Sequence, residues 1–242
     1  MIRAVLFDVD DTLVRFSEAM ALGLTAHLRD VSPGAASGDL LAAAALWKEL
    51  ADIHYPRFLS GELTFQEQRR ARAAEFCERS GLPLGGSAAE QDAWLRAYLH
   101  HCEAAFSLYP DVVPVLDGLS EAGTFLGVVS NSTHDYQDRK LTSLGIRDRF
   151  TALVCCDDVG GAAKPDPRIF TAATDALGVA PSETAYIGDR WETDALAAAR
   201  AGLHGVWLDR GVGERRPGPY PPGVSVIRGL DGATDLLAGA TT

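Results

Sequence analysis

Short apolar runs that end at acidic or small polar residues recur along the chain. The first is residues 4–7, with the sequence AVLF, and acidic residues follow it at once. A continuous apolar run of this length is typical of a strand that is buried on both faces of a parallel sheet. We predict further strands at residues 125–129, 152–156, 184–187 and 205–208, and a final edge strand at residues 224–227.

Segments with helical periodicity separate the runs that follow residue 110. They cover residues 112–122, 135–144, 168–177 and 193–201. A glycine stands after each segment, where a helix commonly ends, at Gly123, Gly145, Gly178 and Gly202. Strands that alternate with helices in this way predict an α/β fold with a doubly wound, mostly parallel sheet.

The stretch from residue 16 to residue 105 has a different pattern, because it contains no convincing strand. Its periodic segments read as successive helices at residues 17–29, 39–52, 64–80 and 88–104. We expect an inserted α-helical cap domain at residues 16–105, an α/β core at residues 1–15 and 106–242, and hinges near residues 14–16 and 106–110. In the tail we expect a loop rich in Gly and Pro over residues 211–223 and a last helix over residues 231–238.

The composition excludes several kinds of partner. The formal net charge is -11, so most of the surface repels a phosphate backbone, and extended binding of nucleic acid is not expected. No segment approaches the roughly 18 apolar residues of a membrane span, and the N-terminus does not read as a signal peptide. The four cysteines form no CxxC pair, which favours free thiols. We expect a cytoplasmic protein, a monomer or a homodimer, that binds neither nucleic acid nor a membrane.

Polar residues that carry chemistry follow three of the predicted strands. Asp8, Ser130 and Asp189 each come at the end of an apolar run. The carboxyl ends of parallel strands share one edge of a sheet, where ligands bind. Asp10 and Asp194 lie close by in sequence, so several carboxylates crowd together and require protons or a cation. Hard oxygen ligands select Mg²⁺ over zinc.

Four motifs, in this order along the chain, resemble one family. Residues 8–12 read DVDDT, Ser130 ends an apolar run, Lys164 opens the sequence KPDPRIF, and residues 188–194 read GDRWETD. Together they resemble the DxDxT signature, the strand-end Ser or Thr, the lysine and the acidic GDxxxxD motif of the haloacid-dehalogenase-like phosphatases. The resemblance covers nearly the whole chain, and the order and spacing of the motifs carry it.

The resemblance implies a role for each matching residue. Asp8 would attack phosphorus and form an aspartyl-phosphate. Asp10 would protonate the leaving alcohol and then deprotonate the hydrolytic water. Mg²⁺ and Lys164 would reduce the repulsion between the carboxylate and the phosphate. Ser130, Lys164 and the backbone amide of Asn131 would hold the phosphoryl oxygens.

The resemblance also implies a metal site. Mg²⁺ would be held by the side chains of Asp8 and Asp189 and by the backbone carbonyl of Asp10. Asp194 would bind through water or orient Lys164. Asp10 argues against a true haloacid dehalogenase, because such enzymes resemble this core but lack an acid at that position and need no Mg²⁺.

Five residues are candidates for substrate specificity. Arg190 and Trp191 stand where small or hydroxyl residues are frequent in the family, and they either contact the substrate or point away from it. In the predicted cap we select Trp47, Tyr55 and Arg57, because an arginine beside aromatic rings can clamp an anionic group or stack on a ring. The alternative is a Trp and a Tyr that pack between helices, with an Arg at the surface.

The function that we expect is Mg²⁺-dependent hydrolysis of a small phosphorylated metabolite. Two alternatives stay open. One is a phosphosugar mutase with the same nucleophile, and the other is a non-catalytic protein that binds a phosphate ligand. Net release of phosphate without a bisphosphate activator separates the first from a phosphatase, and turnover that depends on Asp8 separates the second. Fold alone does not decide between them.

Overall fold

In the computed structural model, residues 1–34, 36–211 and 218–234 are described, and the chain divides into two compact units. The first unit consists of Met1–Arg15 together with the chain from Ser107 onward, and the second is Phe16–Phe106.

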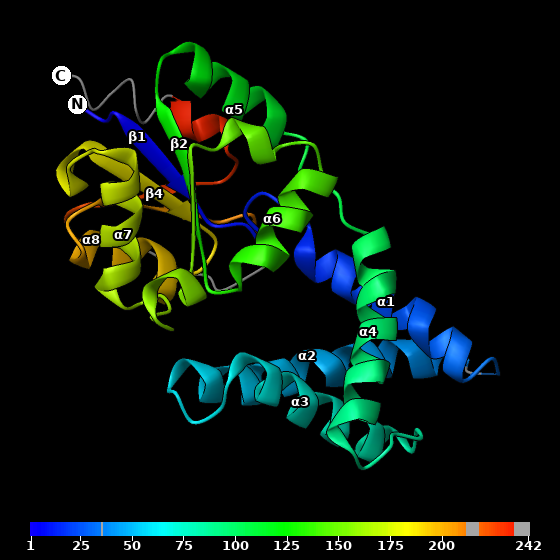
Figure 1. Ribbon diagram of the computed structural model, residues 1–242. Helices are drawn as coiled ribbons and strands as arrows, with labels where there is room; N and C mark the ends of the chain where they lie inside the picture. Colours follow the sequence, from blue (N-terminus) through cyan, green and yellow to red (C-terminus); the bar gives the residue numbers. More distant parts are fainter. Residues whose placement is uncertain (35, 212–217, 235–242) are drawn as a thin grey trace. The chain divides into compact units, whose positions relative to one another are not determined.

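A six-stranded sheet forms the centre of the first unit (Figure 1). Its strands are β1 (Ala4–Phe7), β2 (Phe125–Ser130), β3 (Ala152–Cys155), β4 (Thr184–Gly188), β5 (His204–Leu208) and β6 (Val224–Ile227). The spatial order is β3-β2-β1-β4-β5-β6, and all neighbouring pairs are parallel. The predicted parallel sheet is confirmed, and β6 lies at its edge as expected.

Helices cover both faces of this sheet. α5 (Val112–Glu121) and α6 (His134–Ser143) lie on one side, and α7 (Pro167–Leu177) and α8 (Leu196–Arg200) lie on the other (Figure 1). Successive side chains of β1 point to opposite faces of the sheet. Leu6 belongs to the apolar cluster that includes α7 and α8, whereas the ring of Phe7 meets that of Phe150 edge-on, with centroids 6.3 Å apart. The doubly wound α/β fold is therefore confirmed.

The strand register brings three strand ends to the same level. β1 lies between β2 and β4, and Phe7 pairs with Val128 on one side and with Ile187 on the other. The next residue, Asp8, donates its backbone N–H to the carbonyl of Ile187 at 2.9 Å. The chain runs from β1 through β2 to β3 and then crosses to β4 on the other side of β1. The carboxyl end of β1 is therefore the switch point at which open α/β sheets bind ligands.

The helix predicted at residues 193–201 starts earlier and differently. A π-helical turn, Trp191–Ala195, precedes α8. The physical reason is the carboxylate of Asp194, which accepts a hydrogen bond from the backbone N–H of Arg190 at 2.9 Å and extends the turn backward. In the tail, residues 231–234 are helical, and the rest of the predicted last helix, like residues 212–217 of the predicted loop, lies outside the described residues.

Four helices form the described part of the second unit, as the periodicity predicts. They are α1 (Phe16–Val31), α2 (Ser37–Leu59), α3 (Phe65–Ser80) and α4 (Ala88–Ala104), and they share one apolar core. α2 is longer than the segment predicted at residues 39–52, because it continues through Pro56. Nε2 of His54 lies 2.9 Å from Oε2 of Glu75 on α3, which holds this last part of α2 in place. Among the described residues, no helix combines the length and the apolar character that crossing a membrane requires.

The two connections to the helical insertion lie next to each other on the first unit. The backbone N–H of Arg15 donates to the carbonyl of Ser107 at 2.9 Å, and Val14 forms an antiparallel bridge with Leu108. The chain therefore leaves the first unit and returns to it at one point.

Candidate active site

The carboxyl end of β1 places Asp8 in a buried cluster of charged groups. Nζ of Lys164 lies 2.7 Å from Oδ1 of Asp8 and 2.7 Å from Oδ1 of Asp194, and it donates to the hydroxyl of Tyr186 at 2.6 Å. All four side chains are buried. The Tyr186 hydroxyl, on β4, also lies 3.2 Å from the carbonyl of Val129 on β2. The cluster thus joins three adjacent strands to the loop that carries the lysine.

Burial and charge shift the pKa values of this cluster. Burial raises the pKa of Asp8 to about 7, against the attraction of Lys164 and with the added repulsion of Asp194. Burial by itself lowers the pKa of Lys164, but the carboxylates of Asp194 and Asp8 outweigh it and hold that pKa well above its usual range. The lysine thus stays charged between two acids.

Asp189, which follows β4, brings a third carboxylate to the same place. Oxygens of Asp8, Asp189 and Asp194 lie within 4.8 Å of one another. Oδ1 of Asp189 is buried and has no hydrogen-bond partner among the described residues. Burial, with the repulsion of Asp194 and Asp8, raises the pKa of Asp189 well above its usual range. An orphaned carboxylate oxygen among other carboxylates fits a hard divalent cation such as Mg²⁺.

Asp194 uses both of its oxygens on protein groups. Oδ1 is paired with Lys164, and Oδ2 accepts from the backbone N–H of Arg190. Of the two roles that the resemblance implies, these contacts favour orientation of Lys164.

Asn131 fixes the backbone of Lys164. Its Oδ1 accepts from the N–H of Lys164 at 2.6 Å, and its Nδ2 donates to the carbonyl of Lys164 at 2.9 Å. The segment that follows β2 is therefore tied to the loop that carries the lysine. The resemblance assigns phosphate binding to the backbone amide of Asn131, and these contacts engage its side chain.

The carboxylate of Asp10 is held from α6. Nζ of Lys140 lies 2.6 Å from Oδ1 of Asp10, and Nε2 of Gln137 lies 3.3 Å from Oδ2. The same Nε2 donates to Oγ of Ser130 at 2.9 Å. One helix therefore connects the predicted acid–base residue to the predicted phosphate-binding serine.

The loop of residues 8–14 turns back tightly on itself. Asp11 has φ 63°, in the left-handed region that residues with a side chain seldom adopt. The backbone N–H of Val14 donates to the carbonyl of Val9 at 2.9 Å and closes the turn. The turn is what lets residues 8 and 10 both stand at the sheet edge.

Arg210, which follows β5, clamps this loop from outside. Its guanidinium donates to the carbonyl of Thr12 at 2.9 Å and to both oxygens of Asp111 at 2.9 and 3.1 Å. It also lies 3.7 Å from the centroid of the Tyr109 ring. Asp111 in turn accepts from the backbone N–H of Leu230 at 2.8 Å. The guanidinium thus links its own segment to the loop at Thr12 and to the segment of Tyr109 and Asp111, and Asp111 extends the link to Leu230.

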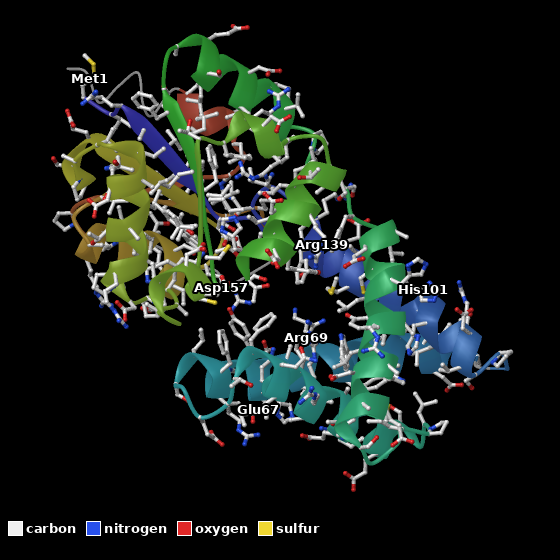
Figure 2. All side chains as sticks on the ribbon, in the orientation of Figure 1. Met1, Glu67, Arg69, His101, Arg139 and Asp157 are labelled. Carbon is white, nitrogen blue, oxygen red and sulfur yellow. The ribbon has the colours of Figure 1, made fainter. Side chains whose placement is uncertain are left out.

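The acids after β3 have structural partners of their own. Asp157, labelled in Figure 2, accepts from the backbone N–H of His134 at the start of α6, at 2.9 Å. Asp158 accepts from the backbone N–H of Cys155 at 2.8 Å. Oδ2 of Asp158 also lies 2.9 Å from Nδ1 of His134, so both acids connect the segment after β3 to the start of α6.

Arg190 and Trp191 have different environments. Trp191 is buried, and its ring lies edge-on to that of Trp207 with centroids 5.6 Å apart. Arg190 is exposed, and its charge acts against the rise in the pKa of Asp189. The bulk of Trp191 thus fills a packing site, which matches the interpretation that it points away, while a substrate contact by Arg190 stays a prediction.

Trp47 lies in the core of the helical unit. Its Nε1 donates to the hydroxyl of Tyr98 at 2.8 Å, and the guanidinium of Arg72 lies 3.9 Å from the centroid of its ring. The residue is 4 % exposed. This is the packing alternative, and it corrects the selection of Trp47 as a substrate contact, because neighbouring side chains already cover the ring.

The other two candidates of the helical unit are more accessible. Arg57 is partly exposed and pairs with Glu62, with Nη2 at 2.6 Å from Oε1. Tyr55 is half-buried, and its ring lies 5.8 Å from that of Phe58. Their role in substrate specificity stays a prediction.

Three residues of the site were not expected from the sequence, namely Gln137, Lys140 and Tyr186. Tyr186 stands in the middle of an apolar strand and reads as a core residue. Gln137 and Lys140 are three residues apart and share one face of α6. That spacing, on the first helix after the strand that ends at Ser130, was the available signal.

Comparison with known proteins agrees with this geometry. Residues 2–202 match the haloacid dehalogenase-like hydrolase family. The chain is 34% identical over 211 residues to the glyceraldehyde 3-phosphate phosphatase of Methanopyrus kandleri, covering 87% of this chain and 85% of that protein.

Solved structures share the fold. The HAD-hydrolase YfnB of Bacillus subtilis, solved bound to magnesium, has a TM-score of 0.81 at 22% identity and covers 98% of this chain and 99% of its own. The 2-haloacid dehalogenase of Pseudomonas syringae pv. Tomato has a TM-score of 0.68 at 24% identity, covering 99% of each chain. At these identities the likeness shows the fold alone.

The parallel sheet with helices on both faces defines an α/β protein, and the acids at its strand ends and the buried lysine define its candidate active site. The chain belongs to the haloacid dehalogenase-like hydrolase family.

Proposed function

We propose that the protein is a Mg²⁺-dependent phosphatase that hydrolyses a small phosphate monoester through an aspartyl-phosphate on Asp8. Membership of the family and the phosphatase relative support a phosphoric monoester hydrolase. The observation that carries the proposal is the buried Asp8 carboxylate, which lies 2.7 Å from Nζ of Lys164 and within 4.8 Å of a carboxylate oxygen of Asp189. Oδ1 of Asp189 has no partner among the described residues. A nucleophile, a fixed cation and a metal-binding acid meet there.

In the first step an oxygen of Asp8 attacks phosphorus, and the P–O bond to the alcohol breaks. The electron pair goes to the alcohol oxygen, which takes a proton from Asp10. Lys164 offsets the repulsion between carboxylate and phosphate, because its ammonium group is held 2.7 Å from Asp8. The products are the free alcohol and an aspartyl-phosphate.

In the second step water attacks the phosphorus of the aspartyl-phosphate. Asp10 takes a proton from the water, the P–O bond to Asp8 breaks, and inorganic phosphate is released. Ser130 and the backbone amide of Asn131 hold the phosphoryl oxygens through both steps. Asp8 returns to its starting form.

The side chains of Asp8 and Asp189 and the backbone carbonyl of Asp10 would hold the Mg²⁺. When bound, Mg²⁺ supplies positive charge against the phosphoryl oxygens. The donor set fits, since it consists of oxygens and includes a buried one without a partner among the described residues.

The proposed substrate is a small phosphorylated metabolite. The relative from Methanopyrus kandleri is named for glyceraldehyde 3-phosphate, which supports this size and class of compound. A screen of phosphate esters, ranked by kcat/KM, identifies the preferred one. A cytoplasmic location and a monomeric or homodimeric state stay predictions.

The test is turnover of p-nitrophenyl phosphate. We expect release of phosphate with MgCl₂, loss of activity in EDTA and recovery when Mg²⁺ is restored. Asp8→Asn should lower kcat by on the order of 10³-fold or more, because it removes the nucleophile. Asp148→Asn, at an exposed acid of the same unit, is the matched control and should leave kcat unchanged.

Two outcomes contradict the proposal. Turnover that survives Asp8→Asn rules out the aspartyl-phosphate, and absence of turnover on every ester supports the non-catalytic alternative. A requirement for a bisphosphate activator, without net release of phosphate, would instead identify a mutase.

A further inference from the structure

The inner face of α6 carries two polar side chains that the proposed chemistry does not yet use. Gln137 and Lys140 are three residues apart on this helix, so they point in the same direction. Both residues are buried, with Gln137 at 0 % and Lys140 at 3 % exposed. A buried lysine requires an opposite charge close by, and the structure provides the carboxylate of Asp10.

The two side chains hold the Asp10 carboxylate by both of its oxygens. Nζ of Lys140 donates to Oδ1 of Asp10 at 2.6 Å, and Nε2 of Gln137 donates to Oδ2 at 3.3 Å. The Asp10 side chain is still 28% exposed, whereas that of Lys140 is 1% exposed. The Asp10 carboxylate is therefore held by α6 and is still partly exposed to solvent.

The amide of Gln137 also sets the position of Asp10 relative to the phosphate site. Its Nε2 has two hydrogens, and its two acceptors are Oδ2 of Asp10 and Oγ of Ser130. The planar amide of Gln137 thus sets the distance between Asp10, the proposed acid–base residue, and Ser130, the proposed phosphate-binding residue.

We propose that Lys140 and Gln137 are positioning residues that hold Asp10 in line with the leaving-group oxygen. This rests on the proposed phosphatase function. Proton transfer requires hydrogen-bond reach and alignment, and a catalytic group must be held to within about 0.5 Å of its productive place. Without Lys140 the carboxylate can rotate away from α6, and the proton no longer reaches the alcohol oxygen as the P–O bond breaks.

The leaving group distinguishes this role from a merely structural one. An alkoxide is a poor leaving group and needs the proton from Asp10, whereas a dinitrophenolate leaves without it. The value of kcat/KM reports the step in which the P–O bond to the leaving group breaks. Loss of positioning therefore lowers kcat/KM for an alkyl phosphate much more than for 2,4-dinitrophenyl phosphate.

The experiment measures kcat/KM for a primary alkyl phosphate and for 2,4-dinitrophenyl phosphate in the same Mg²⁺-loaded preparations. For Lys140→Met we expect a loss on the order of 10²-fold with the alkyl ester and at most about threefold with the dinitrophenyl ester, since general acids contribute roughly 10²- to 10⁴-fold. Lys140→Arg should restore most of the alkyl activity, because it restores a donor to Asp10. The ratio of the two substrates does not depend on how much of each preparation is folded.

Arg139→Met is the matched control, since it removes a cation from an exposed position of the same helix (Figure 2). It should leave the ratio unchanged. Asp10→Asn is the reference, and in the double variant with Lys140→Met the two losses should not add, because both act through one carboxylate.

Two results overturn the inference. One is an equal loss with both substrates in Lys140→Met, and the other is full additivity with Asp10→Asn. Suppose that the unmodified enzyme turns over both esters while Asp10→Asn loses kcat/KM mainly for the alkyl ester. In that case an equal loss in Lys140→Met, or full additivity with Asp10→Asn, contradicts only the positioning role of Lys140. Failure of the unmodified enzyme on both esters removes the phosphatase proposal instead.

Discussion

At the scale of single residues, the described part of the candidate active site has more carboxylates than cations, with one lysine, Lys164, among Asp8, Asp189 and Asp194. Lys164 neutralises part of the charge of Asp8 and Asp194, and Asp189 keeps a buried oxygen without a partner among the described residues. An uncompensated carboxylate in a buried place is costly. A cation that binds there would relieve the cost, so we expect metal binding to stabilise the folded protein.

This linkage gives a prediction for metal removal. Asp189→Asn should weaken Mg²⁺ binding by at least about 10- to 100-fold, because that is the usual loss when only a group that supports a metal ligand is changed. At a concentration 100 times the native Kd, the native protein gains about 2.7 kcal/mol from the metal, whereas a variant that binds 100-fold more weakly gains only about 0.4 kcal/mol. The measurement is the shift of Tm on addition of MgCl₂ to EDTA-treated protein.

The control for this shift is again Asp148→Asn, which should keep the full rise in Tm. An equal rise in native protein and in Asp189→Asn would exclude Asp189 as a metal ligand.

Sequence reasoning found the residues whose position follows from strand ends. Asp8, Ser130 and Asp189 each end an apolar run, and a parallel sheet brings such ends together. It missed Tyr186 and Lys140, because their roles depend on which neighbours face them in three dimensions. A tyrosine within an apolar strand and a lysine on a helix have ordinary explanations until the sheet and helix are placed.

At the scale of elements, α2 shows how an aromatic residue can be misjudged. From the sequence, Trp47 is selected with Tyr55 and Arg57, because an arginine beside aromatic rings can clamp an anionic group or stack on a ring. In the structure its ring packs between α3 and α4, edge-on to Phe76 and to Tyr98, with centroids 5.1 and 5.0 Å away. Periodicity predicts that α2 is a helix, but it does not say which aromatic side chain faces the core.

Two substitutions at Trp47 should separate its hydrogen bond from its packing. Trp47→Phe loses the donor to Tyr98 and should lower the free energy of unfolding by about 1 kcal/mol, plus a smaller packing loss. Trp47→Ala removes the ring and should lower it by about 3 to 5 kcal/mol. Urea unfolding followed by circular dichroism measures both changes.

Leu41→Ala is the control on the same helix, because Leu41 is 75% exposed. It should change the free energy of unfolding by less than about 0.5 kcal/mol. A loss of that small size in Trp47→Ala would mean that Trp47 does not support the core of the helical unit.

At the scale of the whole molecule, the sheet edge is held by contacts between distant parts of the first unit. Arg210 reaches Thr12 across 198 positions of the sequence and Asp111 across 99. The parallel sheet and its edge strand β6 could be predicted from the alternating pattern, because strands that alternate with helices favour parallel pairing. The contacts of Arg210 could not be predicted, since the sequence around a loop arginine does not indicate which distant residues it will contact.

Removing this clamp should affect stability and turnover together. Arg210→Met leaves Asp111 without its main partner and frees the carbonyl of Thr12. We expect a loss of about 2 to 4 kcal/mol in the free energy of unfolding. This is somewhat less than the roughly 3 to 5 kcal/mol for breaking a fully buried ion pair, because the side chains of Arg210 and Asp111 are 12% and 22% exposed. We also expect a lower kcat, because the loop that carries Asp8 and Asp10 loses an anchor.

Arg228→Met serves as the control, because Arg228 is exposed on the same unit. Urea unfolding and turnover of p-nitrophenyl phosphate are measured on both variants. Unchanged unfolding in Arg210→Met would show that the clamp does not stabilise the fold.

The neighbouring connections at Arg15 and Ser107 also bear on how such proteins diversify. Because the chain leaves and re-enters the first unit at one hydrogen-bonded pair, the segment between them closes a loop whose ends already touch. Insertions with adjacent ends disturb their host little, and loop closure costs only slightly more as the insert grows. Recombination can therefore replace residues 16–106 by another segment while the sheet and the side chains at its strand ends stay in place.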